Sequence, residues 1–481
     1  MNMKITKKEE NHIKNQFQKI SSKEDFLELL NYSKNIIYKK KTIPFTLKQL
    51  NYYINKERID TIEYNKNNSS SYKSKFYNRF YINKKNGTKR GLDSPVKGLK
   101  EIQKSLNIIL QVIHNPNKNS YGFIMDKNIC DNAINHVNKN FVFNIDLKDF
   151  FPSIHAKRVY SRLLYKPFNL GDSKERKKIS NIIKTLCCHP LLIKGEINNC
   201  LPQGAPTSPT LSNIVSDKLD FLLTGVAKRF GLSYSRYADD ITFSSHHCTF
   251  FNGKNDENIY NEESTFRKEI ARIITDQGLH INNKKVRLQK KGFKQEVTGL
   301  IVNQKVNVKR SYIKEIRLYL HFWEKYGYDS GKNLFAKRYA DKRHGLDSSL
   351  KIPEFEYVID GKLLFLEMIK GKDNSTAKTL RNRYNDLIHK KENKELLIAM
   401  KKGANFKRKI DSLSKDHIKS SLSVETSKDL TDLIKKEVIT KSKIPENLTT
   451  LRKKGSIDKN QQTLDDIFEL GLDKAMEKLK L

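Results

Sequence analysis

The segment Tyr237–Asp240, which reads Tyr-Ala-Asp-Asp, is the feature that most constrains this chain of 481 residues. It stands between two short runs of β-strand character, residues 232–236 and 241–245. A turn between paired strands lifts adjacent carboxylates out of the sheet, where they can hold divalent metal ions. Exposed turns are rich in aspartate in any case, so the segment taken alone also fits an ordinary turn.

A third carboxylate is available in Asp146, which ends the apolar run Phe141–Ile145 and precedes a bend with two phenylalanines and a proline. A two-metal site for nucleotidyl transfer needs such a third carboxylate, because its ions activate a primer hydroxyl and stabilise the leaving pyrophosphate. Oxygen ligands suit Mg²⁺, which shares the rest of its shell with water and substrate phosphates. Asp146, Asp239 and Asp240 are therefore predicted to bind two Mg²⁺ ions, which Mn²⁺ could replace.

A proline-rich bend, Leu201–Pro209, runs into a predicted helix that ends at Gly231. The apolar residues of this helix recur at helical spacing and mark one buried face: Leu211, Ile214, Val215, Leu219, Leu222, Leu223 and Val226. The bend is therefore expected to lie rigidly beside the strand that leads to Asp239.

In this order, the segments around Asp146, Gln203 and Asp239 resemble the palm motifs of reverse transcriptases, and the resemblance extends over about residues 75–395. It implies an α+β right-hand polymerase with fingers, a palm built on an antiparallel sheet, and a helical thumb. It also implies RNA-directed DNA polymerase activity. In that family Asp146 and Asp239 would bind both metal ions, Asp240 would support them, and Gln203 would contact the sugar of the incoming nucleotide.

The same resemblance implies contacts with a deoxynucleoside triphosphate. Phe151 stands where the family has an aromatic residue against the sugar C2′ position, and its ring would exclude a ribose 2′-hydroxyl. An ordinary core role is the alternative for such rings and suits Phe150 better. Arg90, and next Lys85, would bind the triphosphate from a fingers hairpin, although lysine-rich hairpin tips are often only solvated. Lys285, or the lysine before it, would protonate the leaving pyrophosphate.

Two further elements resemble those of retron reverse transcriptases. Residues 132–136 match an Asn-Ala-X-X-His element through Asn132 and His136, and Val297, Thr298 and Gly299 match a Val-Thr-Gly element. In retrons these elements help the enzyme to recognise its own structured RNA. Similar elements occur in neighbouring bacterial lineages, including defence-associated reverse transcriptases, so they favour this branch without separating its members. His136 could equally be a structural histidine.

The charge of the chain agrees with a nucleic-acid partner. Lysine and arginine number 92 against 54 aspartate and glutamate, which gives a formal charge of +38. Nucleic acids are dense polyanions, and the release of their counterions favours a basic surface. A lysine-rich composition is the alternative, but it would not by itself leave the acidic residues so far behind. The predicted partners are a structured non-coding RNA template, the DNA product and deoxynucleotides, with an effector protein and self-association left open.

Cysteine spacing and hydropathy exclude several other classes. The five cysteines include no C-x-x-C pair, which argues against a zinc knuckle and against a disulfide scaffold. The N-terminus has no apolar signal core, and no apolar run approaches the roughly 20 residues that span a bilayer. We therefore expect a cytoplasmic protein without a membrane partner.

Four segments are predicted along the chain: a helical, basic N-terminal extension at residues 1–74, fingers and palm at 75–303, a helical thumb at 304–395, and a lysine-rich C-terminal extension of unknown role at 396–481. The resemblance predicts a retron-like enzyme that copies a dedicated structured RNA into DNA in anti-phage defence. The main alternative is a non-retron, defence-associated enzyme that makes repetitive or untemplated DNA, with protein priming open. A catalytically silent RNA-binding scaffold and a group II intron maturase are less favoured, because the carboxylate set is complete and a Cys/His endonuclease module is not evident.

Overall fold

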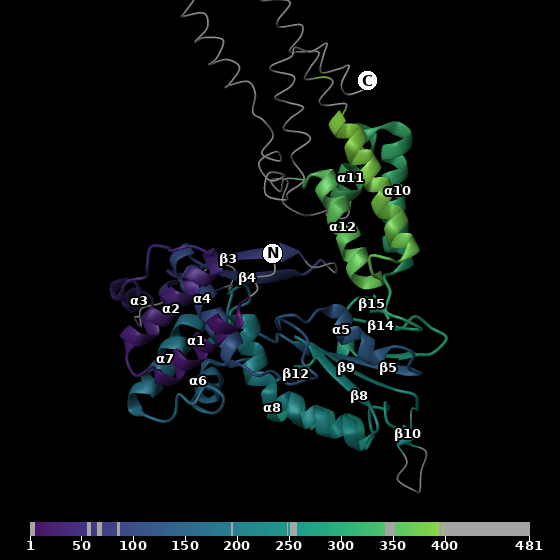
Figure 1. The fold of residues 1–481 in the computed structure, drawn as a ribbon. Coiled ribbons are helices and arrows are strands. Elements are labelled where there is room, and N and C mark those ends of the chain that lie inside the picture. Colours follow the sequence, from purple (N-terminus) through teal and green to yellow (C-terminus); the bar gives the residue numbers. More distant parts are fainter. Residues whose placement is uncertain are drawn as a thin grey trace, which may run out of the picture. The chain divides into compact units, whose positions relative to one another are not determined.

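The structure is a computed structural model that describes residues 5–54, 59–64, 70–83, 87–193, 196–247, 249–250, 257–341, 352–393 and 398. The chain divides into two compact units, Met1–Ile388 and His389–Leu481. All elements discussed below lie in the first unit (Figure 1). Lys85 and Cys248 lie outside the described residues, as do the residues from 394 to the C-terminus apart from Ile398.

The N-terminal segment begins with three helices, α1 (Lys7–Lys19), α2 (Lys23–Tyr38) and α3 (Leu47–Ile54). Capping boxes start the first two, because Thr6 and Ser22 accept hydrogen bonds from the backbone three residues later. Their apolar faces pack against α4 (Lys97–Ile113) and belong to the main hydrophobic core. These helices are therefore part of the same packed core as the predicted fingers and palm.

Two antiparallel ribbons follow the N-terminal helices. The first pairs β1 (Ile59–Tyr64) with β2 (Ser70–Ser74), and the second pairs β3 (Tyr77–Asn83) with β4 (Lys89–Pro95). In β3 only the first residue is buried, whereas β4 becomes buried toward its end. The second ribbon therefore projects from the body of the protein at the position predicted for the fingers hairpin.

The central sheet has the order β12-β5-β9-β8, and β13 also pairs with β5. All pairs are antiparallel. The strands are β5 (Phe141–Lys148), β8 (Ser233–Tyr237), β9 (Asp240–Ser245), β12 (His280–Ile281) and β13 (Arg287–Lys290). The runs predicted on each side of the Tyr-Ala-Asp-Asp segment are thus two paired strands of one sheet.

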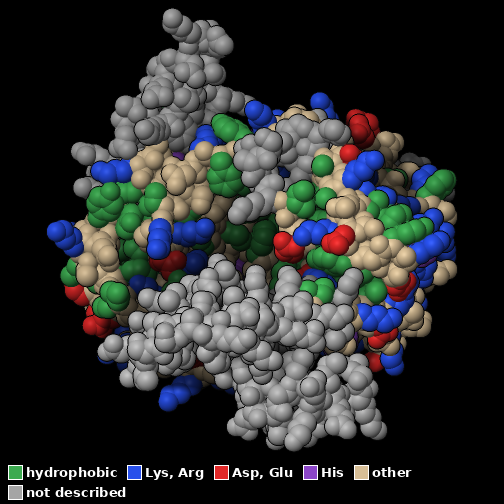
Figure 2. Space-filling view, turned by 90° about the horizontal axis from the view of Figure 1, so that it is seen from above, with side chains coloured by type: hydrophobic (Ala, Val, Ile, Leu, Met, Phe, Trp, Pro, Cys, Tyr) green, Lys and Arg blue, Asp and Glu red, His purple; other side chains and the backbone are tan. Residues whose placement is uncertain are grey.

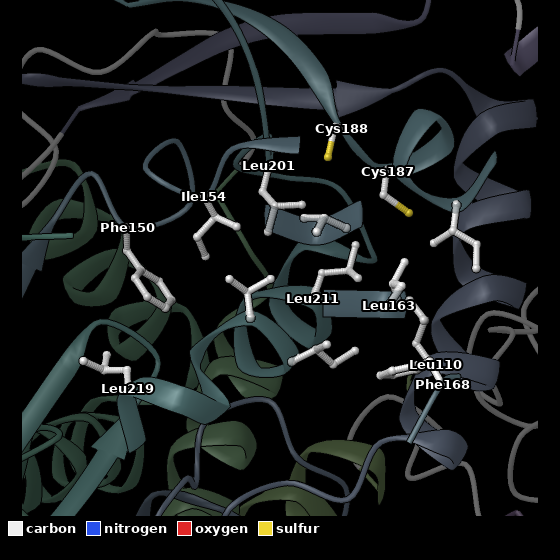
Figure 3. Close-up of a cluster of buried hydrophobic side chains, with 14 of the residues drawn as sticks. Leu110, Phe150, Ile154, Leu163, Phe168, Cys187, Cys188, Leu201, Leu211 and Leu219 are labelled. Carbon is white, nitrogen blue, oxygen red and sulfur yellow. The ribbon is translucent and has the colours of Figure 1, made fainter. Parts of the chain in front are cut away.

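Helix α8 (Ser208–Arg229) packs against β8 and against α9 (Thr265–Asp276). It is the helix predicted after the proline-rich bend, and of its expected apolar face only Leu222 is not fully buried. Two more helices, α6 (Ala156–Leu164) and α7 (Lys174–Cys187), complete this part of the core. Figure 3 shows side chains from these elements meeting, with Cys187 and Cys188 among the apolar residues.

A second hydrophobic cluster lies under three helices near the end of the described chain, α10 (Arg310–Tyr326), α11 (Tyr328–Asp341) and α12 (Phe355–Lys370). Aromatic rings of Trp323 and Phe355 pack within it, with centroids 5.6 Å apart. The remaining short elements are α5 (Ile129–Ala133), η1 (Ile134–His136), η2 (Asn283–Lys285), β6 (His189–Ile193), β7 (Glu196–Cys200), β10 (Thr249–Phe250), β11 (Glu257–Asn258), β14 (Glu296–Val297) and β15 (Leu300–Ile301).

This mixture of helices with antiparallel sheets confirms the predicted α+β class. Within the described ranges, every helix is too short or too polar to cross a lipid bilayer.

Candidate active site

The predicted metal-binding turn joins β8 to β9, with Tyr237 paired opposite Asp240. Its first central residue, Ala238, has a φ of 58°, in the left-handed region that disfavours residues with a Cβ. Gly122 lies against this turn so closely that a Cβ on it would stand 2.6 Å from the backbone nitrogen of Ala238. The turn is thus held in an unusual conformation by a neighbour that must lack a side chain.

Asp146 joins the turn through the pairing of β5 with β9, in which it stands directly opposite Asp240. One residue further, the backbone nitrogen of Leu147 donates to the carbonyl of Asp239 over 3.0 Å. The three predicted metal ligands therefore come from one end of two neighbouring strands and from the turn beside them.

The carboxylate of Asp146 has two cationic or polar partners. Lys285 Nζ donates to Oδ1 over 2.8 Å, and Asn282 Nδ2 donates to Oδ2 over 3.0 Å. The backbone nitrogen of Asn282 also donates to the carbonyl of Asp146 over 2.8 Å, which fixes this segment against β5. Lys285 is thus at the site, as the sequence indicated, whereas nothing in the sequence singled out Asn282.

The carboxylates of the turn are electrostatically strained. Desolvation by the surrounding protein, and after it the charges of Asp239 and Asp146, raise the pKa of Asp240 to about 6, although its side chain still reaches the surface. Burial raises the pKa of Asp239 too, with a further contribution from Asp146, while Lys285 and Arg90 oppose the shift. Carboxylates crowded in this way disfavour their own charged forms unless a cation is present.

Arg90 lies on β4 of the exposed ribbon, where it pairs with Ile82. Its charge acts on Asp239, so the structure brings it within electrostatic range of the turn. Gln203 lies in the bend before α8, and its carbonyl accepts from the backbone nitrogen of Asp93 over 2.8 Å. Gly204, with a φ of 125°, allows this close approach, because a Cβ there would stand 3.0 Å from the Asp93 carbonyl. The bend is therefore docked onto the ribbon that carries Arg90.

Phe151 is half-buried, and its ring lies 5.6 Å from that of Phe150 and 6.3 Å from that of Phe123. Phe150 is fully buried, as expected for a core residue. Phe123 was not expected at the site: it is 40% exposed, has a φ of 61°, and lies 6.3 Å from the ring of Tyr237. Its ring connects the predicted sugar gate to the predicted metal-binding turn, and a lone glycine-phenylalanine pair gives no sequence signal of that position.

Comparison with known proteins identifies the family. Residues 82–302 match the family described as reverse transcriptase (RNA-dependent DNA polymerase). The chain is 34% identical to the Retron Ec86 reverse transcriptase of Escherichia coli over 256 residues. This match covers 52% of this chain and 71% of that protein. The chain belongs to the retron-type reverse transcriptases. The predicted family and enzyme class, RNA-directed DNA polymerase, are thereby confirmed.

A second relative and a solved structure extend the comparison. The Retron Mx65 reverse transcriptase of Myxococcus xanthus is 32% identical over 254 residues, which cover 51% of this chain and 55% of that protein. A telomerase structure from Candida albicans, in complex with a fragment of telomeric RNA, has 10% identity and a TM-score of 0.35 over 76% of this chain and 68% of that chain. That score is too low for a comparison of individual residues.

Membership of the reverse transcriptases implies dependence on divalent metal ions in general. Within the described ranges, no three His, Cys, Asp or Glu side chains converge closely enough to form a metal shell. The chemistry of the turn nevertheless fits such ions, because Asp146, Asp239 and Asp240 offer only oxygen donors and their mutual repulsion would be relieved by a cation.

The elements shared with retron enzymes are largely internal in this reverse transcriptase. Asn132, His136 and Val297 are buried, whereas Thr298 and Gly299 form the turn between β14 and β15 with φ values of 47° and 85°. The Nδ1 and Nε2 atoms of His136 each lie 2.7 Å from a serine Oγ, on Ser244 and Ser235 respectively. A role of these residues in RNA recognition stays a prediction, and for the buried ones it would act through positioning.

The burial of His136 predicts a pH dependence of stability in this reverse transcriptase. Burial, and to a smaller extent Lys139, lowers the pKa of His136 to about 3. When the pH falls below the ordinary histidine pKa of about 6.5, His136 therefore binds a proton in the unfolded chain but stays neutral in the native protein. The stability that this residue contributes is present above pH 6.5 and is lost as the pH falls toward 3, by about 1.4 kcal/mol for each pH unit.

The matched control is His136→Gln, which keeps a donor and an acceptor but does not titrate. Denaturant unfolding at pH 6.5 and pH 5 should show that the wild type loses about 2 kcal/mol more than the variant over this interval. Equal losses in the two proteins would show that His136 is protonated in the native state.

Proposed function

We propose that this reverse transcriptase copies a dedicated structured non-coding RNA into DNA by two-metal nucleotidyl transfer, as part of an anti-phage defence system of the retron type. The observation that carries the chemistry is the juxtaposition of Asp146 with Asp239 and Asp240, beside Lys285. A protein that only binds RNA has no use for clustered carboxylates facing a polyanion. The similarity to several retron enzymes supports the choice of template.

The residues of the site would divide the reaction among them. Two Mg²⁺ ions, or Mn²⁺ in their place, would be held by the three carboxylates and would activate the primer hydroxyl and stabilise the pyrophosphate. Arg90 would hold the triphosphate. Gln203 would contact the sugar of the incoming nucleotide, and Phe151 would lie against its C2′ position. Lys285, freed from Asp146, would give a proton to the leaving pyrophosphate. Most of the acceleration would come from positioning and from charge neutralisation.

We also propose that the segments predicted from the sequence are functional parts: fingers and palm at residues 75–303 and a thumb at 304–395. The separate hydrophobic cluster under α10, α11 and α12 supports a distinct thumb. The N-terminal segment 1–74 would brace the fingers, because α1 and α2 pack against α4.

A basic basin of about 820 Å³ supports the binding of nucleic acid beyond the carboxylates. Five of its lining residues define it: Phe293, Lys294, Lys305, Lys309 and Arg310. Its neighbouring acid, Glu296, is already paired with Lys294 over 2.5 Å and with Lys309 over 2.9 Å. Positive charge therefore remains in excess, and lysine and arginine are also spread over the face of the protein seen in Figure 2.

Two further features of the basic basin suit a nucleic acid. Phe293 follows a glycine turn and is 75% exposed, as a platform for an unpaired base would be. Lys370 lies beside the basin and donates from Nζ to Oδ1 of Asn307, one of the lining residues, over 3.2 Å. Burial, and then the charge of Lys305, lower the pKa of Lys370, so these cations repel each other. A phosphate backbone would relieve this repulsion.

The basin can be tested by Lys305→Gln with Arg310→Gln, which should weaken RNA binding about tenfold and reduce the slope of log affinity against log salt by about 2. Fluorescence anisotropy with a labelled RNA hairpin measures both quantities. The matched control is Lys7→Gln with Lys8→Gln on the exposed face of α1, which should change neither. An unchanged slope in the basin variant would exclude phosphate contacts there.

The enzymatic part of the proposal is tested by primer extension on an RNA template with the purified protein, deoxynucleotides and Mg²⁺. Extension that depends on the RNA sequence and on the metal supports it. Nucleotide addition that ignores the template would favour untemplated synthesis instead, and no addition with either Mg²⁺ or Mn²⁺ would contradict it.

A further inference from the structure

The metal-binding turn is backed by a buried ion pair. Arg236, near the end of β8, and Asp220, on α8, are both completely inaccessible to solvent. The pair is bidentate: Arg236 Nε donates to Oδ1 over 2.7 Å, and Nη2 donates to Oδ2 over 2.6 Å. Tyr234 also donates its hydroxyl to Oδ1 over 2.7 Å. Planar pairing of this kind fixes the guanidinium in one orientation.

The remaining donors of Arg236 reach two other parts of the protein. Nη1 donates to the carbonyl of Ala238 over 3.0 Å and to Oδ1 of Asn213 over 3.1 Å. Nη2 also donates to Oγ of Ser120 over 3.2 Å. One side chain therefore connects α8, the segment before α5, and the turn itself.

The segment before α5 is fixed to the same strand by its backbone. Arg236 donates its backbone nitrogen to the carbonyl of Asn119, and its carbonyl accepts from Tyr121, each over 2.9 Å. Asn213 then donates from Nδ2 to the carbonyl of Gly122 over 2.7 Å. This places Gly122 against the backbone nitrogen of Ala238. Ala238 is consequently held on its nitrogen side by packing and on its carbonyl side by Arg236.

This arrangement answers a physical need of the turn. An alanine in the left-handed region keeps that conformation only if its surroundings impose it. Released from Arg236, the turn could relax, and Asp239 would move with it because the two residues are adjacent. Small displacements of catalytic groups have large effects on rate.

We infer that Arg236, oriented by Asp220, is a positioning residue for catalysis: it holds the Tyr-Ala-Asp-Asp turn so that Asp239 and Asp240 lie beside Asp146. The inference rests on the proposed function. Arg236 is inaccessible to solvent, so it would act on the site through the backbone of the turn.

The test is Arg236→Lys, which keeps the charge but loses the fork of donors. The kcat for primer extension should fall by about tenfold, and the metal concentration for half-maximal activity should rise several-fold. The KM for deoxynucleotides and the affinity for template-primer should stay within about twofold, because those contacts lie elsewhere. A general loss of folded protein would lower the total activity but would leave the metal concentration for half-maximal activity (the metal midpoint) unchanged.

The matched control is Arg381→Lys, which alters another bidentate arginine, bonded to Glu367 over 2.6 and 3.3 Å and to Asp360 over 2.5 Å among the helices of the predicted thumb. It should leave kcat and the metal midpoint unchanged. Should Arg236→Lys fail to fold, Arg236→Met with Asp220→Leu removes both charges together, so that no unpaired charge stays buried. A folded variant of either kind with normal kcat and a normal metal midpoint would overturn the inference.

Hydrogen exchange gives a readout that does not depend on activity. Peptides that contain residues 233–245 should exchange faster in Arg236→Lys than in the wild type, while peptides from α12 should not change. If the wild type makes no DNA but this local difference is present, the proposed function fails and the structural anchor stands. If exchange in the turn is unchanged, the anchor fails whatever the activity.

Discussion

Replacing Asp239 with asparagine is expected to lower the rate of nucleotide addition by about a thousandfold or more, because the charge that would bind the metal ions is lost. The fold should survive. The hydrogen bond from Leu147 ends on the backbone carbonyl of Asp239, which the substitution keeps. Burial and Asp146 raise the pKa of Asp239, so its charged form is disfavoured in the folded protein. The melting temperature of the variant should therefore equal or exceed that of the wild type.

Single-turnover primer extension together with thermal unfolding measures both effects. Asp149→Asn is the matched control, since Asp149 is exposed and lies on the bend that follows β5. It should retain activity close to that of the wild type. Substantial activity in the Asp239 variant would mean that the carboxylates of the turn do not carry the chemistry.

The second large effect is expected for Phe151→Ala, which should raise the use of ribonucleotides relative to deoxynucleotides by about 10- to 100-fold. The half-buried ring would otherwise clash with a 2′-hydroxyl, and steric clashes of this size correspond to about 1–3 kcal/mol. Discrimination is measured as the ratio of kcat/KM for the two nucleotides on one template. The effect should appear as a lower KM or a higher kcat for ribonucleotides, with a much smaller change for deoxynucleotides.

Phe150→Leu provides the comparison for this gate. Phe150 is buried beside Phe151, so its shortening should reduce stability without changing the sugar ratio. An unchanged ratio in Phe151→Ala, or an equal change in both variants, would remove Phe151 from the role of gate.

The carboxylates and their strands could be predicted because their signals are local. An apolar run ending at Asp146, and strand-like runs on each side of Asp239, determine two strands and a turn from neighbouring residues alone. The buried face of α8 follows from helical spacing in the same way. Local periodicity also predicted burial of Leu222, which is only partial, because the width of the buried face depends on what packs against it.

The supports of the site could not be predicted, because they join residues far apart in the chain. Asp220 and Arg236 form an ion pair only once α8 lies along β8. In a lysine-rich chain, the sequence does not indicate which charged residues are buried or which of them pair. Asn282 meets Asp146 through the pairing of β12 with β5. The left-handed conformation of Ala238 could not be predicted either, because this backbone region is typical of glycine and asparagine and not of alanine.

The most direct test of the account is sequencing of the nucleic acid that co-purifies with the wild-type protein and with the Asp239→Ala, Asp240→Ala double variant, with nuclease digestion to separate RNA from DNA. The account predicts one defined RNA in both samples and DNA complementary to it only in the wild type. Repetitive DNA without an RNA counterpart would contradict the dedicated template, and RNA with no DNA under any condition would contradict reverse transcription itself.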